Sequence, residues 1–256
     1  MSKENNAQSA LVRGLAIIEW ICAQDRPVSS AEAAEAVGLP KATAHRMAQQ
    51  LEAQGYLQHM PGSKRFSGGP KLHGLALAAL SNSVIGAPRH AILQSLSEEI
   101  EETCNCTMLE GSHIVYFDRV EANWPYRIHL PVGTHLPLHC TASGKLFLAL
   151  MPKMRCERLL NTLTLTRHTD LTITDPARLE AQLGRIREDG ISVDEGEYLD
   201  GLISLAIPVL DEHERICFAI AVHAPTARRS VMELRQYLPA MRRAAGKLSS
   251  VIQGVD

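Results

Sequence analysis

Residues 29–46 read SSAEAAEAVGLPKATAHR, and this stretch contains two helix starts separated by a turn. Ser29 and Glu32 have the spacing of a capping box, in which each side chain binds a backbone amide at the beginning of a helix. Residues 37–40 predict a turn, because Pro40 is favoured at the first position of a new helix. We therefore expect a short helix, a turn and a second helix over about 40–54.

The segments on either side extend this motif. Residues 8–24 predict a helix whose inward face holds Leu11, Leu15, Ile18 and Cys22 at helical spacing. Residues 56–60 and 64–67 are separated by Pro-Gly-Ser, which predicts a two-stranded hairpin. Helices joined by a glycine-containing turn and followed by a basic hairpin are the parts of a winged helix-turn-helix, which we place in residues 1–70.

The charge is distributed unevenly along the chain. Residues 38–77 hold five basic residues and one acidic residue, whereas residues 86–256 hold 18 basic and 22 acidic ones. This asymmetry predicts that only the N-terminal part binds a polyanion, here double-stranded DNA. In a helix-turn-helix the start of the second helix reaches base edges, and cations on the hairpin neutralise phosphates. The expected DNA contacts are Arg13, Lys41, Thr43, His45, Arg46, Lys64 and Arg65.

The second part of the chain, residues 89–256, mixes helices and strands and follows a linker helix and hinge at 71–88. A hairpin across 110–113 and strands at 202–210 and 216–222 predict a sheet. Helices are expected over 141–150, from Asp175, and from the capping box at Ser230 to about residue 250. The expected fold class is α+β.

Two sets of short motifs span nearly the whole chain. The first set is Arg13-Gly14-Leu15, residues 39–46 and Gly55-Tyr56-Leu57. The second set is Leu136-Pro137-Leu138-His139, Ser143-Gly144-Lys145, Gly190-Ile191 with Asp194 and Glu197, and residues 206–209. Together these motifs resemble the IclR family of bacterial transcriptional regulators. The resemblance implies a winged helix-turn-helix, a linker helix and a GAF-like α/β effector domain that forms a homodimer or homotetramer.

A small-molecule site is expected at the start of the helix over 141–150. Small side chains there expose backbone amides that favour an anion such as a carboxylate, although a tightly packed helix start capped by Thr141 explains them too. Lys145 is expected to anchor an anion or to be solvated. The resemblance implies pocket positions at Ile128, Leu136, Ala142, Ser143, Asp194, Leu202, Ser204, Ala221 and His223. The chain departs from the family's usual residues at the last three, which leaves the identity of the effector open.

Other functions fit the sequence less well. A phosphate-binding loop would need glycine where His139 stands, and no Gly-x-Ser-x-Gly elbow occurs, so we expect neither an enzyme nor a cofactor. A structural DNA-binding protein would leave the second part without a role. A metal-responsive regulator is the alternative, because Cys104, Cys106, His135, His139 and Cys140 supply metal-binding atoms, although no Cys-x-x-Cys pair supports it.

The composition argues against a membrane protein and against an exported, disulfide-bonded one. The chain has 256 residues, 45% of them hydrophobic, with no apolar run near the roughly 20 residues that a membrane span needs. Its N-terminus lacks the apolar centre of a signal peptide, and six irregularly spaced cysteines do not indicate a disulfide framework. Together with the resemblance to the IclR family, these features imply a cytoplasmic transcriptional regulator of catabolic genes that senses a small organic acid, with aromatic acids among the candidates.

Overall fold

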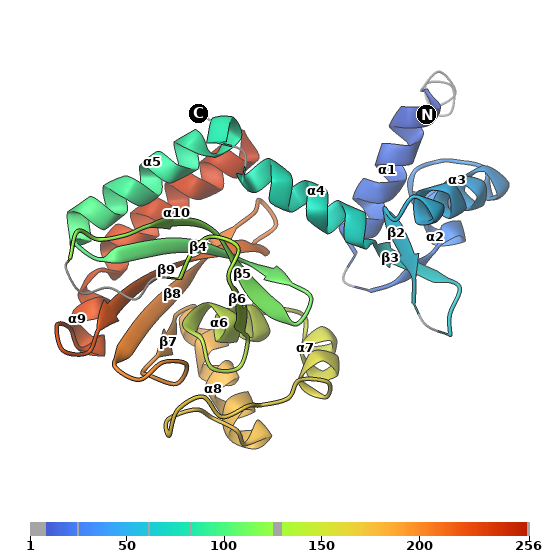
Figure 1. Cartoon of the computed structure of the whole chain (residues 1–256). Helices are drawn as coiled ribbons and strands as arrows, with labels where there is room; N and C mark the ends of the chain where they lie inside the picture. Colours follow the sequence, from blue (N-terminus) through green and yellow to red (C-terminus); the bar gives the residue numbers. More distant parts are fainter. Residues whose placement is uncertain (1–8, 25, 61, 82, 125–129, 255–256) are drawn as a thin grey trace. The chain divides into compact units, whose positions relative to one another are not determined.

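The computed structural model describes residues 9–24, 26–60, 62–81, 83–124 and 130–254, which belong to two compact units (Figure 1). The division falls between Ala79 and Leu80, within helix α4 (Pro70–Ser81). Helix α5 (Ser83–Ile100) continues through Pro88, so most of the segment predicted as a linker, 71–88, is helical. Its action as a hinge stays a prediction.

The N-terminal unit has the predicted winged helix-turn-helix architecture. Helices α1 (Ala10–Cys22), α2 (Ser30–Ala36) and α3 (Lys41–Ala53) pack with an antiparallel sheet of order β1-β3-β2. The strands are β1 (Val28–Ser29), β2 (Leu57–His59) and β3 (Arg65–Gly68). Both hydrogen bonds of the capping box at the start of α2 are present, from Glu32 N to Ser29 Oγ and from Ser29 N to Glu32 Oε2.

The inward face predicted for α1 is wrong. Ile17 and Ile21 are the buried residues of this helix, whereas Leu11 is 72% exposed and Leu15 is 49% exposed. Only a narrow face of the helix packs on the rest of the unit, whereas its apolar residues extend over a wider part of its circumference. Part of α1 therefore presents an apolar surface that nothing in the described chain covers.

The C-terminal unit is built on a six-stranded antiparallel sheet of order β6-β5-β4-β9-β8-β7. Its strands are β4 (Thr103–Glu110), β5 (His113–Val120), β6 (His135–Pro137), β7 (Ser192–Asp194), β8 (Leu202–Leu210) and β9 (Ile216–Pro225). The predicted hairpin and the two predicted long strands are all present. Of the two long strands, β9 lies at the centre of the sheet and β8 lies between β9 and the edge strand β7, and helices cover both faces of the sheet.

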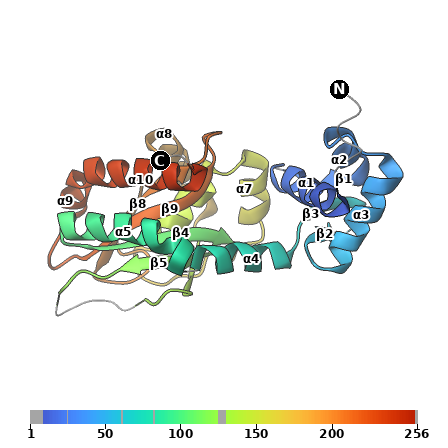
Figure 2. The same ribbon diagram turned by 90° about the horizontal axis from the view of Figure 1, so that it is seen from above.

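Helices α5 and α10 (Leu238–Gln253) lie side by side on one face of this sheet (Figures 1 and 2). Helices α6 (Ala142–Leu150) and α8 (Pro176–Asp189) cover the other face. The predicted closing helix is divided at Tyr237 into α9 (Val231–Gln236) and α10, and α7 (Lys153–Leu160) was not predicted. No helix among the described residues has both the length and the apolar character needed to cross a bilayer.

Alternating side chains on β8 and β9 explain how the layers meet. Large apolar residues point toward α5 and α10, including Ile203, Leu205, Ile207, Phe218, Ile220 and Val222. The face toward α6 instead holds Ala206, Ala219 and Ala221, and small side chains let a helix approach the sheet closely. Ser204 and His223, which oppose each other in the ladder, continue this face beyond the alanines.

Gly144 brings α6 into close contact with the segment before it. A Cβ atom at this position would lie 2.4 Å from Leu138 O and 2.5 Å from Leu138 Cα, and both are backbone atoms. Side-chain rotation cannot relieve such a contact, so the helix start would have to shift.

We expect Gly144→Ala to lower the free energy of unfolding of the C-terminal unit by about 1–3 kcal/mol through overpacking. Gly184→Ala in α8 is the matched control, because nothing lies within 4 Å of the added Cβ. The control should be neutral or should stabilise the unit by about 0.5–1 kcal/mol. Differential scanning calorimetry of the full chain measures both, and equal transition temperatures for the two variants would contradict the close contact.

Candidate functional site

Helix α3 presents its predicted DNA-binding residues to the outside. Lys41, His45 and Arg46 are exposed and Thr43 is half-buried, whereas Ala44, Met47 and Ala48 face the core. This division follows from the helical period, which separates the two sets onto opposite faces. Among the described residues, Lys41 and Arg46 make no side-chain hydrogen bond or ion pair, so their charges are available to an external anion.

The other predicted DNA contacts differ in whether their side chains already bind a group within the protein. Lys64 is exposed and without a partner in the part of the chain that the structure describes. Arg65 is exposed too, but its Nη1 donates to Pro27 O (3.1 Å) and Glu32 Oε2 (3.3 Å). His45 Nδ1 lies 3.1 Å from Ser30 Oγ, and Arg13 Nε is buried with no described partner. Contacts of these residues with DNA stay predictions.

A cavity in the C-terminal unit lies between the N-terminal end of α6 and the strands of the sheet. Seven of the nine predicted effector residues line it: Leu136, Ala142, Ser143, Asp194, Leu202, Ser204 and His223. Ala221 does not line the cavity, because it faces α6 in the packed core. Ile128 lies outside the described residues. Lining residues that the sequence did not predict for it are Ile114, Tyr116, Leu130, Thr141 and Tyr198.

The start of α6 supplies one wall of this cavity. Thr141 caps the helix, since its Oγ1 accepts from Gly144 N (3.2 Å) and donates to Pro137 O (2.7 Å). The first amides of a helix have no intrahelical acceptor, and Ala142 and Ser143, the first two residues of α6, both line the cavity. The cavity itself is narrow, about 10 Å³, which is room for roughly one water molecule, so its walls would have to separate to admit an organic acid.

Asp194 is the acidic group of the cavity. Its Oδ1 accepts hydrogen bonds from Gly196 N (3.0 Å) and Glu197 N (2.7 Å), which fold residues 194–197 into a turn. Burial raises the pKa of Asp194 to about 7, and the ammonium of Lys145 opposes this rise. Its charge therefore changes near neutral pH.

Lys145 is neither solvated nor an anion anchor, contrary to prediction. Its side chain is fully buried and donates to Glu197 Oε1, and Glu197 itself is 5% exposed. An isolated charge is too costly to bury, so each residue requires the other. The signal in the sequence was a lysine within an otherwise apolar helix, which needs an acidic partner from another segment.

His223 points into the unit rather than to solvent. Burial lowers its pKa to about 3, and the nearby positive charge of Arg119 lowers it further, so the imidazole is neutral. Its Nε2 lies 3.5 Å from the Tyr116 hydroxyl, and its Nδ1 is buried without a described partner. Asn105, on the same face of the sheet, also has both side-chain polar atoms buried and unpartnered. Of these two residues His223 lines the cavity, so its Nδ1 is available to a polar group of a ligand there.

The residues proposed for the metal alternative do not come together as a group. Cys104 and Cys106 are buried in the core between the sheet and α5, and His135 pairs with Glu110. His139 and Cys140 do lie together, and His168, which the sequence did not single out, joins them.

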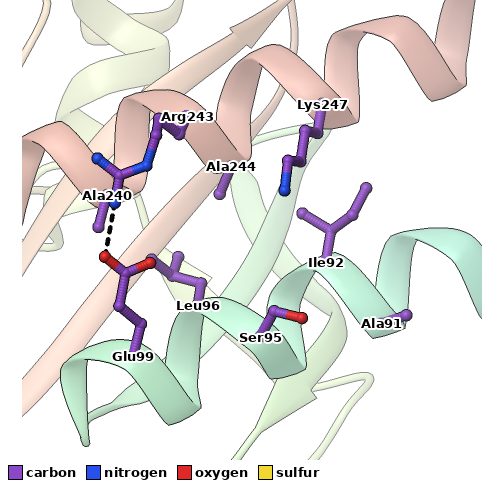
Figure 3. Close-up of a pocket in the computed structure, with 9 residues that line it drawn as sticks. All are labelled: Ala91, Ile92, Ser95, Leu96, Glu99, Ala240, Arg243, Ala244 and Lys247. Atoms are coloured by element: carbon purple, nitrogen blue, oxygen red, sulfur yellow. Dashed lines mark hydrogen bonds and ion pairs between the residues drawn. The ribbon is translucent and has the colours of Figure 1, made fainter.

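A separate groove lies between α5 and α10 (Figure 3). Arg243 donates to Glu99 (2.6 Å) across it, and Ala91, Ala240 and Ala244 line it. Both helices cover the face of the sheet opposite α6, so the sheet separates this groove from the cavity that contains Asp194.

Comparisons with known proteins agree with this architecture. Residues 10–61 match the IclR helix-turn-helix domain, and residues 77–250 match the family described as bacterial transcriptional regulator IclR C-terminal. The probable transcriptional regulator SauR of Cupriavidus necator is 41% identical over 244 residues, which cover 95% of this chain and 97% of SauR. These families and this relative are transcriptional regulators, not enzymes.

Solved structures show the same fold. IclR of Thermotoga maritima superposes with a TM-score of 0.62 at 25% identity, covering 93% of this chain and 96% of that one. A double mutant of the PobR inducer-binding domain from Acinetobacter, in complex with 3-hydroxybenzoic acid, has a TM-score of 0.58 at 25% identity. The match covers 62% of this chain and 94% of the PobR domain. The chain belongs to the IclR family of bacterial transcriptional regulators.

Proposed function

We propose that this regulator controls catabolic genes in response to a small carboxylate, which binds in the cavity at the start of α6. The observation that carries the proposal is the meeting of the α6 amides with Asp194 and His223 around one enclosed space. The amides favour an anion, and the neutral His223 can donate a hydrogen bond to it. Apolar walls from Ile114, Leu136 and Leu202 would hold the rest of the ligand.

An aromatic acid is the ligand class that we favour. Tyr116 and Tyr198 place two aromatic rings in the cavity lining, where they can pack against a ligand ring. The PobR domain, which shares the fold, was solved with 3-hydroxybenzoic acid bound. The hydroxyl of 3-hydroxybenzoic acid could donate a hydrogen bond to a carboxyl oxygen of Asp194. These features support the proposal and name 3-hydroxybenzoate as a first probe.

The DNA-binding part of the proposal rests on charge and exposure. Lys41, Thr43, His45 and Arg46 would enter the major groove from α3, with Lys64 and Arg65 on phosphates beside the hairpin and Arg13 on a phosphate from α1. We expect DNA contacts most strongly at Lys41, Arg46 and Lys64, because none of these side chains has a partner among the described residues of the protein. The protein would act in the cytoplasm, where the operator DNA is.

A homodimer or homotetramer is the proposed form. Two copies are needed to read a two-fold-symmetric operator, because one recognition helix covers one half-site. The exposed apolar residues of α1, Leu11, Val12 and Leu15, offer a surface that a second copy could bury. A ligand that binds one assembly geometry more tightly would then shift the spacing of the recognition helices.

Selection of genomic DNA fragments by the purified protein at two salt concentrations tests the proposed function. We expect enrichment of one two-fold-symmetric site that survives the higher salt, beside genes of carboxylate catabolism. Binding that is blind to sequence and collapses with salt would mean phosphate attraction only, and the regulator proposal would fail. Enrichment of an unsymmetrical single half-site would instead contradict the dimer.

Arg46→Ala should relax specificity at one base position of the selected operator by about 1–3 kcal/mol, because arginine reads guanine through two hydrogen bonds. Lys64→Ala is the contrasting variant. It should weaken binding to all sequences alike and reduce the slope of log affinity against log salt by about 1, as expected for one phosphate contact. Fluorescence anisotropy with a panel of single-base operator variants measures both effects. Unchanged discrimination in Arg46→Ala would remove this residue from base readout.

The affinity for 3-hydroxybenzoate should fall about tenfold between pH 6 and pH 8. With a pKa of about 7, Asp194 is mostly protonated at pH 6 and ionised at pH 8, where it repels the carboxylate of the ligand. His223 stays neutral over this range because its pKa is about 3, and burial keeps the Tyr116 and Tyr198 hydroxyls protonated by raising their pKa values. Isothermal titration calorimetry measures the affinity.

Asp194→Asn is the matched variant, because the amide oxygen can still accept from Gly196 N and Glu197 N while the titration is lost. Its affinity for 3-hydroxybenzoate should be nearly independent of pH, with operator binding in the absence of ligand unchanged. A steep pH dependence that persists in Asp194→Asn would show that another group controls it. Absence of binding to the unsubstituted protein would contradict an aromatic acid of this size.

A further inference from the structure

His139, Cys140 and His168 form a compact group of metal-binding side chains in the C-terminal unit. One ligand atom from each lies within 4.8 Å of the other two. His139 and Cys140 are buried, at 2% and 0% exposure, and His168 is exposed. Neighbouring residues in a strand point to opposite sides, but His139 and Cys140 lie in a turn before α6, which lets both side chains reach His168.

We propose that these three residues bind a divalent transition-metal ion of the zinc class. Imidazole nitrogen and thiolate sulfur are the ligands that such ions prefer, and three protein ligands leave one position for water or a small molecule. In a tetrahedral zinc site the ligand atoms lie about 3.4–3.7 Å apart, from metal–ligand distances of about 2.0–2.3 Å. The group must therefore contract by about 1 Å. The ring of His168 is exposed and packs against Tyr198, with ring centroids 5.3 Å apart, so it would supply that movement by turning within this contact.

A hydrogen bond to His139 prepares this residue for a metal. Its Nε2 lies 2.9 Å from the carbonyl oxygen of Thr166, which can only accept, so Nε2 carries the proton and Nδ1 keeps a free lone pair. A backbone carbonyl that fixes the tautomer of a histidine is the usual second contact of a metal-ligating imidazole. Burial also lowers the pKa of His139, which favours the neutral form that a metal needs.

The segment that carries His168 is held in place by threonines. Thr172 Oγ1 accepts from the backbone N–H of His168 (3.0 Å) and donates to Glu197 O (2.6 Å). Thr169 Oγ1 donates to Gly196 O (2.7 Å). The backbone at His168 is therefore anchored to the turn that contains Asp194, and only its side chain needs to move on metal binding.

Cys140 must lose its proton to become a ligand. Burial raises the pKa of this thiol to about 12, with Asp194 and Glu197 adding to the rise and Lys145 opposing it. On binding, the sulfur–metal bond forms as the S–H bond breaks, and the proton passes to solvent. The charged groups near the thiol are those two carboxylates and the Lys145 ammonium, which pairs with Glu197. A divalent cation would balance the charge that remains on Asp194 together with the Cys140 thiolate.

Cobalt(II) binding to the full-length, untagged chain, stripped of metal with a chelator, tests the site. We expect one equivalent of Co²⁺ to produce a thiolate-to-cobalt charge-transfer band in the near ultraviolet, and Zn²⁺ to displace it. Cys140→Ser should abolish the band. His168→Gln, at an exposed position that the fold does not depend on, should weaken Co²⁺ binding at least about tenfold while the band persists at saturation.

Cys217→Ser and His213→Gln are matched controls, because these residues lie outside the group, and both should leave the band and the affinity unchanged. Circular dichroism checks that each variant is folded. No band in the unsubstituted chain, a band that persists in Cys140→Ser, or an affinity that His168→Gln leaves intact would overturn the proposal. Equal loss in a control and in Cys140→Ser would do the same, since it would place the metal elsewhere.

Discussion

The buried ion pair between Lys145 and Glu197 is the constraint on which the effector unit depends. Neither charge can be left alone in the core, because breaking a buried pair by removing one partner costs about 3–5 kcal/mol. Lys145 stands in the first turns of α6 and Glu197 in the turn after β7, so the pair joins these two segments. Asp194 belongs to the same turn, and its position relative to the helix start is fixed by the same contact.

That one junction organises both candidate binding groups of the unit. Ala142 and Ser143 line the cavity from α6, and Asp194 and Tyr198 line it from the segment after β7. The cavity therefore lies where the Lys145–Glu197 ion pair joins the helix to that segment. His139 and Cys140 immediately precede the same helix, and the threonines beside His168 bind the carbonyls of Gly196 and Glu197. A ligand or a metal bound here would act on segments that are already tied to each other. Small residues on the sheet, such as Ala206 and Ala219, allow α6 to sit close enough for this arrangement.

Local signals in the sequence were sufficient for most of the fold. Capping boxes at Ser29 and Ser230, and the Thr141 cap, depend only on neighbouring residues, and each is present where the spacing placed it. The inward face of α1 was wrong because the helix is apolar over a wider arc than it buries. The burial of Lys145 was not predicted for another reason. Its partner Glu197 lies 52 residues away, and sequence spacing carries no information on such a contact. His168 escaped notice likewise, since only the tertiary fold brings it to Cys140.

Binding alone does not make the unit a regulator. A ligand that satisfies the unpartnered Nδ1 of His223 stabilises the state that binds it, but an equilibrium shifts only when a second state binds the ligand less well. The sheet is covered by helices on both faces, and such a packed core resists gradual deformation. A second state is therefore more easily built from surfaces between copies of the chain than from a change within the sheet. The exposed apolar residues of α1 are one surface through which two copies could meet, and the ligand response that we propose would then require self-association rather than merely accompany it.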